Sequence, residues 1–200
     1  MSRSTVVGVA TAAALIVSAC HAAAPATGSD SAPRATIVLV TAQTTAPPPT
    51  APSTVGQETD GGWLSKPVSP FDTTSLAVIR LDPPLLRAVQ DAANSAAADG
   101  LTLTVTSGWR SRAFQQQLLD DAVQTYGSLA VARQWVATPD ESQHVQGKAV
   151  DIGPASAYDW MRRHSTQFGL CQVFANEKWH FELTADAEGT CPPLRTNAAG

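Results

Sequence analysis

Residues 21–62 are rich in Ala, Pro, Thr and Ser, and they include the run Ala-Pro-Pro-Pro-Thr-Ala-Pro at positions 46–52. A segment of this composition buries too little apolar surface to offset the entropy lost when it orders, so it is typical of a mobile tether. We therefore expect a flexible tether over residues 20–62 and a folded part over residues 63–200. Roughly 140 residues is room for a single domain.

The charge balance of the chain argues against one class of partner. The formal net charge of the 200 residues is −4. Binding to nucleic acid calls for Lys and Arg gathered on one face, and the sequence contains no such cluster. We therefore expect no nucleic-acid partner. We also expect a monomer.

An apolar run at residues 6–17 follows the weakly positive start Met-Ser-Arg. This run suits a signal peptide and falls short of the ~20 residues that span a bilayer. It ends in Val-Ser-Ala-Cys at residues 17–20, which resembles the lipobox of bacterial lipoproteins. The resemblance implies a signal peptide over residues 1–19, a lipid on the thiol of Cys20, and an exported chain anchored in the cell envelope at the outer face of the cytoplasmic membrane. A secretory signal followed by an incidental Cys is the alternative.

The chain has three cysteines, an odd number for an exported protein. If Cys20 carries lipid, Cys171 and Cys191 remain as one pair in an oxidising compartment. We therefore expect a disulfide between Cys171 and Cys191. Two unpaired, buried thiols are the alternative.

Hydrophobic periodicity and turn residues predict helices mixed with short strands after residue 80. Asp82 and the prolines that follow it are typical of a helix start, and Ser111 is a candidate cap for a second helix that Gly127 ends. The pattern predicts helices over residues 83–98, 112–126, 128–137 and 156–168, and strands over residues 101–105, 149–152, 170–174 and 179–183. Helices that precede and interrupt a small group of strands indicate an α+β domain with a small, mainly antiparallel sheet.

Two histidines lie near carboxylates in polar stretches. Residues 142–151 read Ser-Gln-His-Val-Gln-Gly-Lys-Ala-Val-Asp, and residues 177–180 read Glu-Lys-Trp-His. Two imidazoles and a carboxylate are a ligand set of catalytic zinc sites, and a carboxylate that is not bound can act as a general base. Residues three apart on a straight strand face opposite sides, so Glu177 and His180 converge only if the chain bends, which we expect at residues 175–176. Taken singly, such residues are usually structural or solvated.

These stretches resemble a known family. The first matches the Ser-x-His-x-x-Gly-x-Ala-x-Asp signature of the D-alanyl-D-alanine carboxypeptidases and dipeptidases, and the second matches their Glu-x-Trp-His signature. Residues 107–111, Ser-Gly-Trp-Arg-Ser, resemble the family's Ser-Gly-Tyr-Arg-Ser segment, with Trp in place of Tyr. The three motifs occur in the family's order, and the resemblance extends over about residues 80–185.

The resemblance implies a fold, a site and a substrate. The fold would be the one shared by hedgehog and the DD-peptidases, with a zinc site at the sheet and Zn2+ as the cofactor. His144, Asp151 and His180 would be the zinc ligands, Glu177 the catalytic base, and Arg110 the cation that holds the scissile carbonyl. The reaction would be hydrolysis of the terminal D-alanine amide bond of peptidoglycan stem peptides.

Three positions near the motifs affect what the resemblance implies. Ser142 is expected to support the metal loop through a hydrogen bond. Gln143 stands where family members often have an acidic residue, and Glu182 stands where many have Arg. Glu182 could therefore change how the substrate's terminal carboxylate is received. An L,D-carboxypeptidase, a peptidoglycan endopeptidase and a non-catalytic wall-binding lipoprotein remain alternatives.

The anchoring hypothesis has a direct test. Because the lipid would be carried by the thiol of Cys20, a Cys20→Ser chain should leave the membrane fraction or stay unprocessed. Cell fractionation and mass spectrometry of the mature N-terminus measure this. A mature chain with an unmodified Cys20 would decide for plain secretion.

Overall fold

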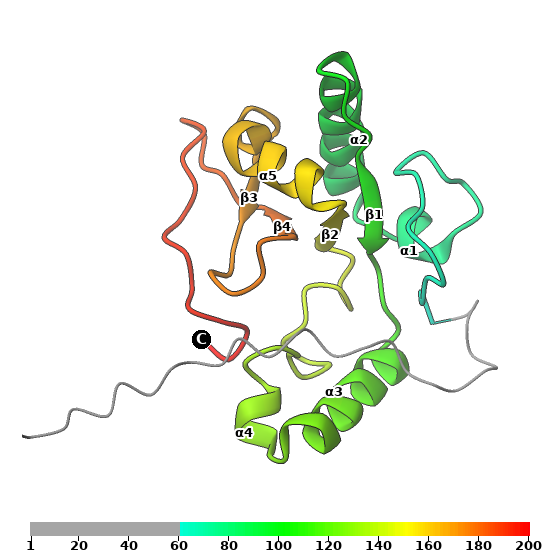
Figure 1. Cartoon of the computed structure of the whole chain (residues 1–200), viewed down its shortest axis with the longest axis vertical. Coiled ribbons are helices and arrows are strands. Elements are labelled where there is room, and N and C mark those ends of the chain that lie inside the picture. Colours follow the sequence, from blue (N-terminus) through cyan, green and yellow to red (C-terminus); the bar gives the residue numbers. More distant parts are fainter. Residues whose placement is uncertain (1–60) are drawn as a thin grey trace, which may run out of the picture. The chain divides into compact units, whose positions relative to one another are not determined.

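In the computed structural model, which describes residues 61–200, four strands form one sheet with helices packed around it (Figure 1). The elements in chain order are α1 (Leu76–Ile79), α2 (Pro83–Ala98), β1 (Thr104–Ser107), α3 (Arg112–Tyr126), α4 (Leu129–Ala132), β2 (Ala149–Gly153), α5 (Ala155–His164), the 3-10 helix η1 (Ser165–Phe168), β3 (Leu170–Gln172) and β4 (His180–Leu183). No helix in this part of the chain combines the length and apolar character needed to cross a bilayer. The expected signal peptide (1–19), Cys20 and all but the end of the tether (20–62) lie outside the described residues.

The sheet has the strand order β1-β2-β4-β3, and every neighbouring pair is antiparallel. Thr104 lies opposite Gly153 at one edge, Asp151 lies opposite His180 in the centre, and Gln172 lies opposite Phe181 at the other edge. The expected α+β class with a small antiparallel sheet is therefore confirmed.

One face of the sheet builds the main hydrophobic core. Val150 and Ile152 of β2 and Phe181 of β4 are buried there against Leu85 and Val89 of α2. Side chains alternate between the two faces of a strand, so the residues between these apolar ones point to the opposite face. Asp151 and His180 are two of those residues, so their position follows from the burial of their neighbours.

A second, smaller core joins α3 to α4, below the sheet in Figure 1. It buries Leu119, Ala122, Ala132 and Val136. The expected caps of α3 are present: the hydroxyl of Ser111 accepts a hydrogen bond from the backbone N–H of Phe114 at 3.1 Å, and Gly127 ends the helix at a φ of 77°.

Several predicted boundaries were wrong. The helix expected over residues 156–168 ends at His164, and the 3-10 helix η1 follows it. The first strand begins at Thr104 and not at Leu101, because the N–H of Leu101 bonds to Ala96 and closes the end of α2. The helix expected over residues 128–137 stops at Ala132. Beyond it, the carbonyl of Gln134 accepts hydrogen bonds from Asn176 and Ala198, so it serves tertiary contacts.

Cys171 and Cys191 form a disulfide, as expected from the cysteine count. The bond joins β3 to the segment that follows β4. Residues 173 and 174, which were expected to continue β3, instead meet this same segment, because Phe174 pairs with Arg195 in a parallel bridge. The C-terminal segment is thus attached along the edge of the sheet, as Figure 1 shows.

Candidate functional site

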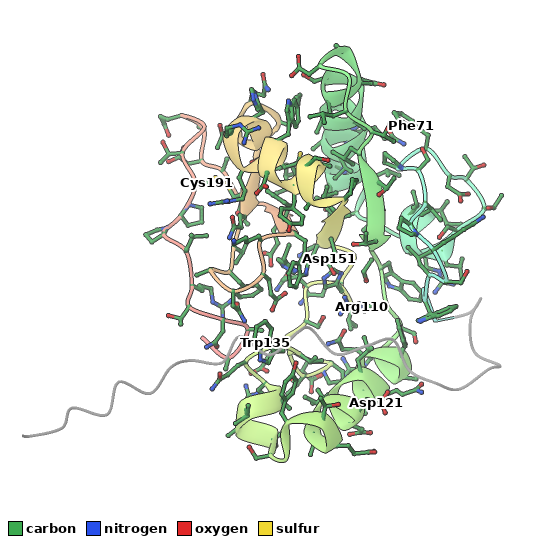
Figure 2. All side chains as sticks on the ribbon, in the orientation of Figure 1. Phe71, Arg110, Asp121, Trp135, Asp151 and Cys191 are labelled. Atoms are coloured by element: carbon green, nitrogen blue, oxygen red, sulfur yellow. A yellow bond between two sulfur atoms is a disulfide. The ribbon has the colours of Figure 1, made fainter. Side chains whose placement is uncertain are left out.

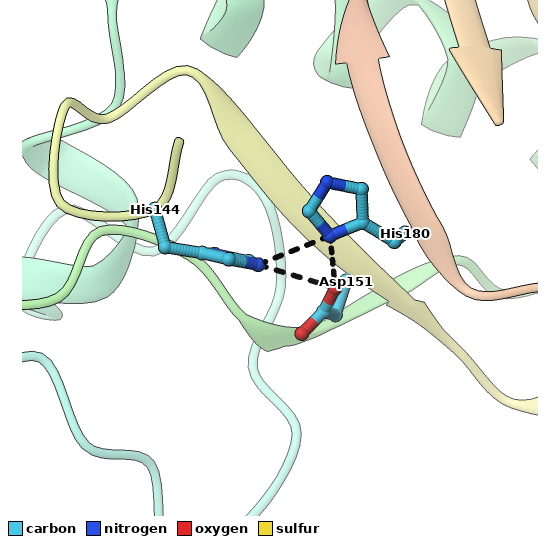
Figure 3. Close-up of side chains that lie close together, drawn as sticks. All are labelled: His144, Asp151 and His180. Carbon is cyan, nitrogen blue, oxygen red and sulfur yellow. Dashed lines mark hydrogen bonds and ion pairs between the residues drawn. The ribbon is translucent and has the colours of Figure 1, made fainter. Parts of the chain in front are cut away.

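Three side chains from separate parts of the sequence converge at the sheet (Figure 3). Asp151 comes from β2, His180 from β4, and His144 from the loop that precedes β2. Nε2 of His144 lies 3.3 Å from Nδ1 of His180 and 3.4 Å from Oδ1 of Asp151, and the last two atoms are 3.3 Å apart. All three residues are buried. The three atoms therefore form a nearly equilateral triangle.

This triangle fits a bound metal ion. A tetrahedral zinc site with bonds of about 2.0–2.1 Å has edges of about 3.3–3.4 Å, which matches the three distances. Oδ1 of Asp151 is buried and has no hydrogen-bond partner among residues 61–200, as expected of an atom reserved for a ligand that is not a proton donor. The group His144, Asp151 and His180 could thus hold a metal ion.

Hydrogen bonds on the far side of each ring direct the correct nitrogen toward this point. Nδ1 of His144 donates to the carbonyl of Gly108 at 2.7 Å, which leaves Nε2 with a free lone pair. Nε2 of His180 donates to Oε1 of Glu182 at 2.9 Å, which leaves Nδ1 as the nitrogen that faces the same point. Such outer partners fix both the tautomer and the orientation of metal-binding histidines.

The loop that carries His144 is shaped by Gly147. Gly147 has a φ of 71°, and a Cβ there would come within 2.5 Å of the carbonyl oxygen of Arg80. The loop is tied down by the carbonyl of His144, which accepts hydrogen bonds from the N–H groups of Arg110 and Gly147, both at 3.1 Å. A residue with a side chain at position 147 would therefore force this loop or the backbone at Arg80 to shift.

The electrostatics of the site also favour a cation. Burial opposes the charge of Asp151, but His144, His180 and Arg110 outweigh it and hold the pKa of Asp151 well below its usual range. Burial likewise opposes a charge on His180, yet its close contacts with the carboxylates of Asp151 and Glu182 raise its pKa to about 9. A proton on His180 thus offsets the same negative charge that a bound divalent metal ion would offset.

Burial, followed by the charge of Arg110, lowers the pKa of His144. This ring is therefore neutral at pH 7, which is the form that binds a metal. The two histidines start from opposite protonation states, and binding of a metal would release the proton of His180.

Arg110 lies beside the triangle, just after β1. Its Nη2 pairs with Oδ2 of Asp151 at 3.1 Å, its Nη1 donates to Gln115 at 3.1 Å, and its Nε donates to the hydroxyl of Ser107 at 2.9 Å. Gln115 is buried in α3 and also donates to the carbonyl of Ala137 at 2.8 Å. Arg110 is therefore held rigidly. These three bonds use three of the five N–H groups of its guanidinium, and two N–H groups remain.

Glu177 reaches the site through a turn. The chain bends at residues 175–176, as expected, and a turn at residues 177–180 follows, in which the N–H of His180 bonds to the carbonyl of Glu177 at 3.2 Å. Oε2 of Glu177 lies 3.8 Å from Nδ1 of His180, while its buried Oε1 has no hydrogen-bond partner within the described residues. Burial raises the pKa of Glu177 to about 7. A carboxylate of this pKa is suited to accept a proton near neutral pH.

These groups line a cavity of about 340 Å³. Its polar wall includes Arg110, Ser142, Glu177 and the triangle, and its apolar wall includes Leu118, Trp135, Val136, Phe174 and Ala198. Figure 2 shows Arg110 and Asp151 close together, with Trp135 toward the side of α4. Glu182 is absent from the residues that line this cavity. It lines a smaller one with Lys148 and Gln143, so it faces away from the space in which a substrate would lie.

The sequence model of the VanY family, described as D-alanyl-D-alanine carboxypeptidase, matches residues 78–186. The chain belongs to this family. The curated D-alanyl-D-alanine carboxypeptidase of Enterococcus faecalis (strain ATCC 700802 / V583) is 32% identical in an alignment over 128 residues, and the match covers 52% of this chain and 46% of the relative. The chain thus spans about half the length of the curated relative that it matches.

Solved structures agree with this membership. A mutant of the vancomycin resistance D,D-pentapeptidase VanY from a VanB-type resistance cassette, in complex with Zn(II), is 26% identical, with a TM-score of 0.51 over 64% of this chain and 81% of that chain. The LdcB LD-carboxypeptidase is 21% identical, with a TM-score of 0.52 over 61% of this chain and 67% of that chain. At that identity the second likeness shows the fold alone.

Some residues of the site gave no signal in the sequence. The carbonyl of Gly108 and the side chain of Gln115 act through contacts that no motif describes. Glu182 was noticed as a departure from the family pattern, but its contact with His180 follows only from their i, i+2 spacing on β4. The expected support of the metal loop by Ser142 stays a prediction; this residue is buried and lines the cavity.

The contact between Glu182 and His180 predicts a change in metal binding. Glu182→Ala removes the acceptor for Nε2 of His180, so the ring loses its fixed tautomer, and the zinc affinity should fall about 10- to 100-fold. Glu182→Gln keeps an acceptor oxygen and should lose less. Competition with a chelator measures the zinc dissociation constant, and Glu188→Ala, at an exposed carboxylate, is the control. A Glu182→Ala chain that binds zinc as tightly as wild type would show that this contact is unimportant.

Proposed function

We propose that the chain is a zinc-dependent carboxypeptidase that hydrolyses the terminal D-alanine amide bond of peptidoglycan stem peptides. The observation that carries the proposal is the content of one cavity. It holds three ligand atoms spaced as three vertices of a zinc tetrahedron, a buried carboxylate oxygen without a partner in the described chain, and a fixed guanidinium. Membership of the VanY family supports the choice of substrate.

Zinc is the metal that suits this ligand set best. Two imidazole nitrogens and one carboxylate oxygen are typical of catalytic zinc sites, which keep a fourth position open. The related VanY mutant was solved in complex with Zn(II), which supports the same choice for this chain. When bound, zinc supplies Lewis acidity to the scissile carbonyl and makes water a nucleophile at neutral pH.

Glu177 is the base in this proposal. Its Oε1 takes a proton from the attacking water and later delivers that proton to the nitrogen of the leaving D-alanine. Two features support this role: Oε1 has no partner elsewhere in the described chain, and the pKa of Glu177 lies near 7. A retained base of this kind also argues against the alternative of a non-catalytic wall-binding protein.

Arg110 has two tasks. It holds Oδ2 of Asp151, which leaves Oδ1 for the metal, and its remaining N–H groups are available to the carbonyl oxygen as negative charge develops there. Because Ser107 and Gln115 lock the guanidinium in place, little reorganisation is needed at the moment of reaction.

The proposed substrate implies a location outside the membrane. A stem peptide lies in the cell wall, so we propose that the chain is exported and held there by a lipid on Cys20, with residues 20–62 as its tether. The apolar run and the lipobox-like residues 17–20 support this, and the tether would let a monomeric domain reach stems at a distance from the membrane.

Defined stem peptides test the proposal. The zinc-loaded chain should release D-alanine from a pentapeptide stem, and a chelator should abolish this. Glu177→Gln should keep one zinc per chain but lose about 100- to 10,000-fold in kcat, because the proton acceptor is gone. Glu188→Gln, at an exposed position, is the matched control and should behave as wild type.

The choice of bond is read from the same experiment. Cleavage of tetrapeptide stems alone would indicate an L,D-carboxypeptidase, and cleavage of cross-linked stems would indicate an endopeptidase. Zinc-loaded protein that cleaves no stem, or a Glu177→Gln chain as fast as wild type, would contradict the proposed mechanism.

A further inference from the structure

Residues 191–198, called the strap here, lie beyond the residues that match the family model and run from the sheet toward α4 (Figure 1). The strap is attached at three points. Cys191 is bonded to Cys171 of β3. Arg195 exchanges backbone hydrogen bonds with Val173 at 2.9 Å and Ala175 at 2.8 Å. At its end, the N–H of Ala198 points to the carbonyl of Gln134 at 3.4 Å.

The strap is tied to the residues that carry the chemistry. The carbonyl of Gln134 also accepts a hydrogen bond from the side chain of Asn176 at 2.9 Å, and Asn176 directly precedes Glu177. The guanidinium of Arg195 lies 5.1 Å from the ring centre of Phe174, whose ring in turn lies 4.9 Å from that of His180. The strap therefore bridges the sheet and the helical segment across one end of the site.

Ala198 forms part of the cavity wall at this end. Leu118, Trp135 and Val136 also line this cavity, and none of them carries a charge. Trp135 and Val136 directly follow Gln134, whose carbonyl receives the N–H of Ala198. Arg110, Glu177 and the triangle line the same cavity. An uncharged, partly aromatic surface favours an alkyl group, and the space left for that group depends on how close the strap lies.

We propose that the strap sets the size of the side chain accepted at the apolar end of the cavity, and that Ala198 is the residue that limits it. The disulfide holds the strap in this position. The proposal rests on the proposed function, in which the accepted side chain is the methyl group of a D-alanine. A larger residue at position 198 would occupy the space of that methyl group.

Two matched variants of the full chain test this directly. Ala198→Leu adds volume inside the cavity, whereas Ala199→Leu adds the same volume at the exposed neighbour. With stems that end in D-alanine, Ala198→Leu should raise KM about tenfold or more with a smaller change in kcat, because the lost space acts on binding. A stem that ends in glycine should be affected less, and Ala199→Leu should match wild type.

Release of the strap should have the opposite effect. A Cys171→Ser, Cys191→Ser double variant should accept stems that end in D-leucine more readily, so that the preference for D-alanine falls about tenfold. Circular dichroism and zinc content establish that the variant is folded and loaded. If this variant does not fold, the comparison of Ala198→Leu with Ala199→Leu still tests whether Ala198 limits the size of the accepted side chain.

Equilibrium binding of the dipeptide D-Ala-D-Ala separates the two proposals. If the zinc-loaded chain cleaves stems and Ala198→Leu behaves as Ala199→Leu, the strap proposal is wrong and the function stands. If the chain cleaves no stem yet binds the dipeptide, the function is wrong. The strap proposal is then supported if Ala198→Leu weakens dipeptide binding about tenfold and Ala199→Leu does not. It is overturned if both variants bind the dipeptide equally well. A chain that neither cleaves nor binds overturns both.

Discussion

Antiparallel pairing of β2 with β4 places Asp151 directly opposite His180 in the middle of the sheet. Their neighbours Val150 and Phe181 are buried in the core on the other face. A shift of this register by one residue would turn the two apolar side chains out of the core and the two ligands into it, so burial on one face fixes the chemistry on the other. His144, Glu177 and Arg110 are then brought to this pair by loops.

The carboxylates around His180 outnumber the permanently charged basic side chains that are paired with them. Asp151, Glu177 and Glu182 all lie close to His180, and Arg110 is the basic side chain paired with Asp151 in this cluster. Without a metal, the balance is met by a proton, which is why the pKa of His180 rises to about 9. A metal would replace that proton, and Nε2 of His144 and Nδ1 of His180 already point to one place. The fold therefore holds the ligands in position before the ion binds.

Much of this arrangement could be predicted from the sequence, because it follows from local signals. Ser111 and Gly127 mark the ends of α3, and the motif residues around His144, Asp151 and His180 indicated a metal site. The start of β1 was misplaced, since the alternation at Leu101 does not reveal that its N–H closes α2. The role of Glu182 and the contact of Ala198 with Gln134 depend on which segments meet in space, and periodicity carries no information on that.

Anomalous X-ray scattering at the zinc edge, measured on crystals of the zinc-loaded chain, tests the central claim most directly. We expect a single strong peak in each domain, about 2.0–2.2 Å from Nε2 of His144, Oδ1 of Asp151 and Nδ1 of His180. A peak at another position, or a folded, active chain with no peak between these three side chains, would contradict a zinc site at this triangle.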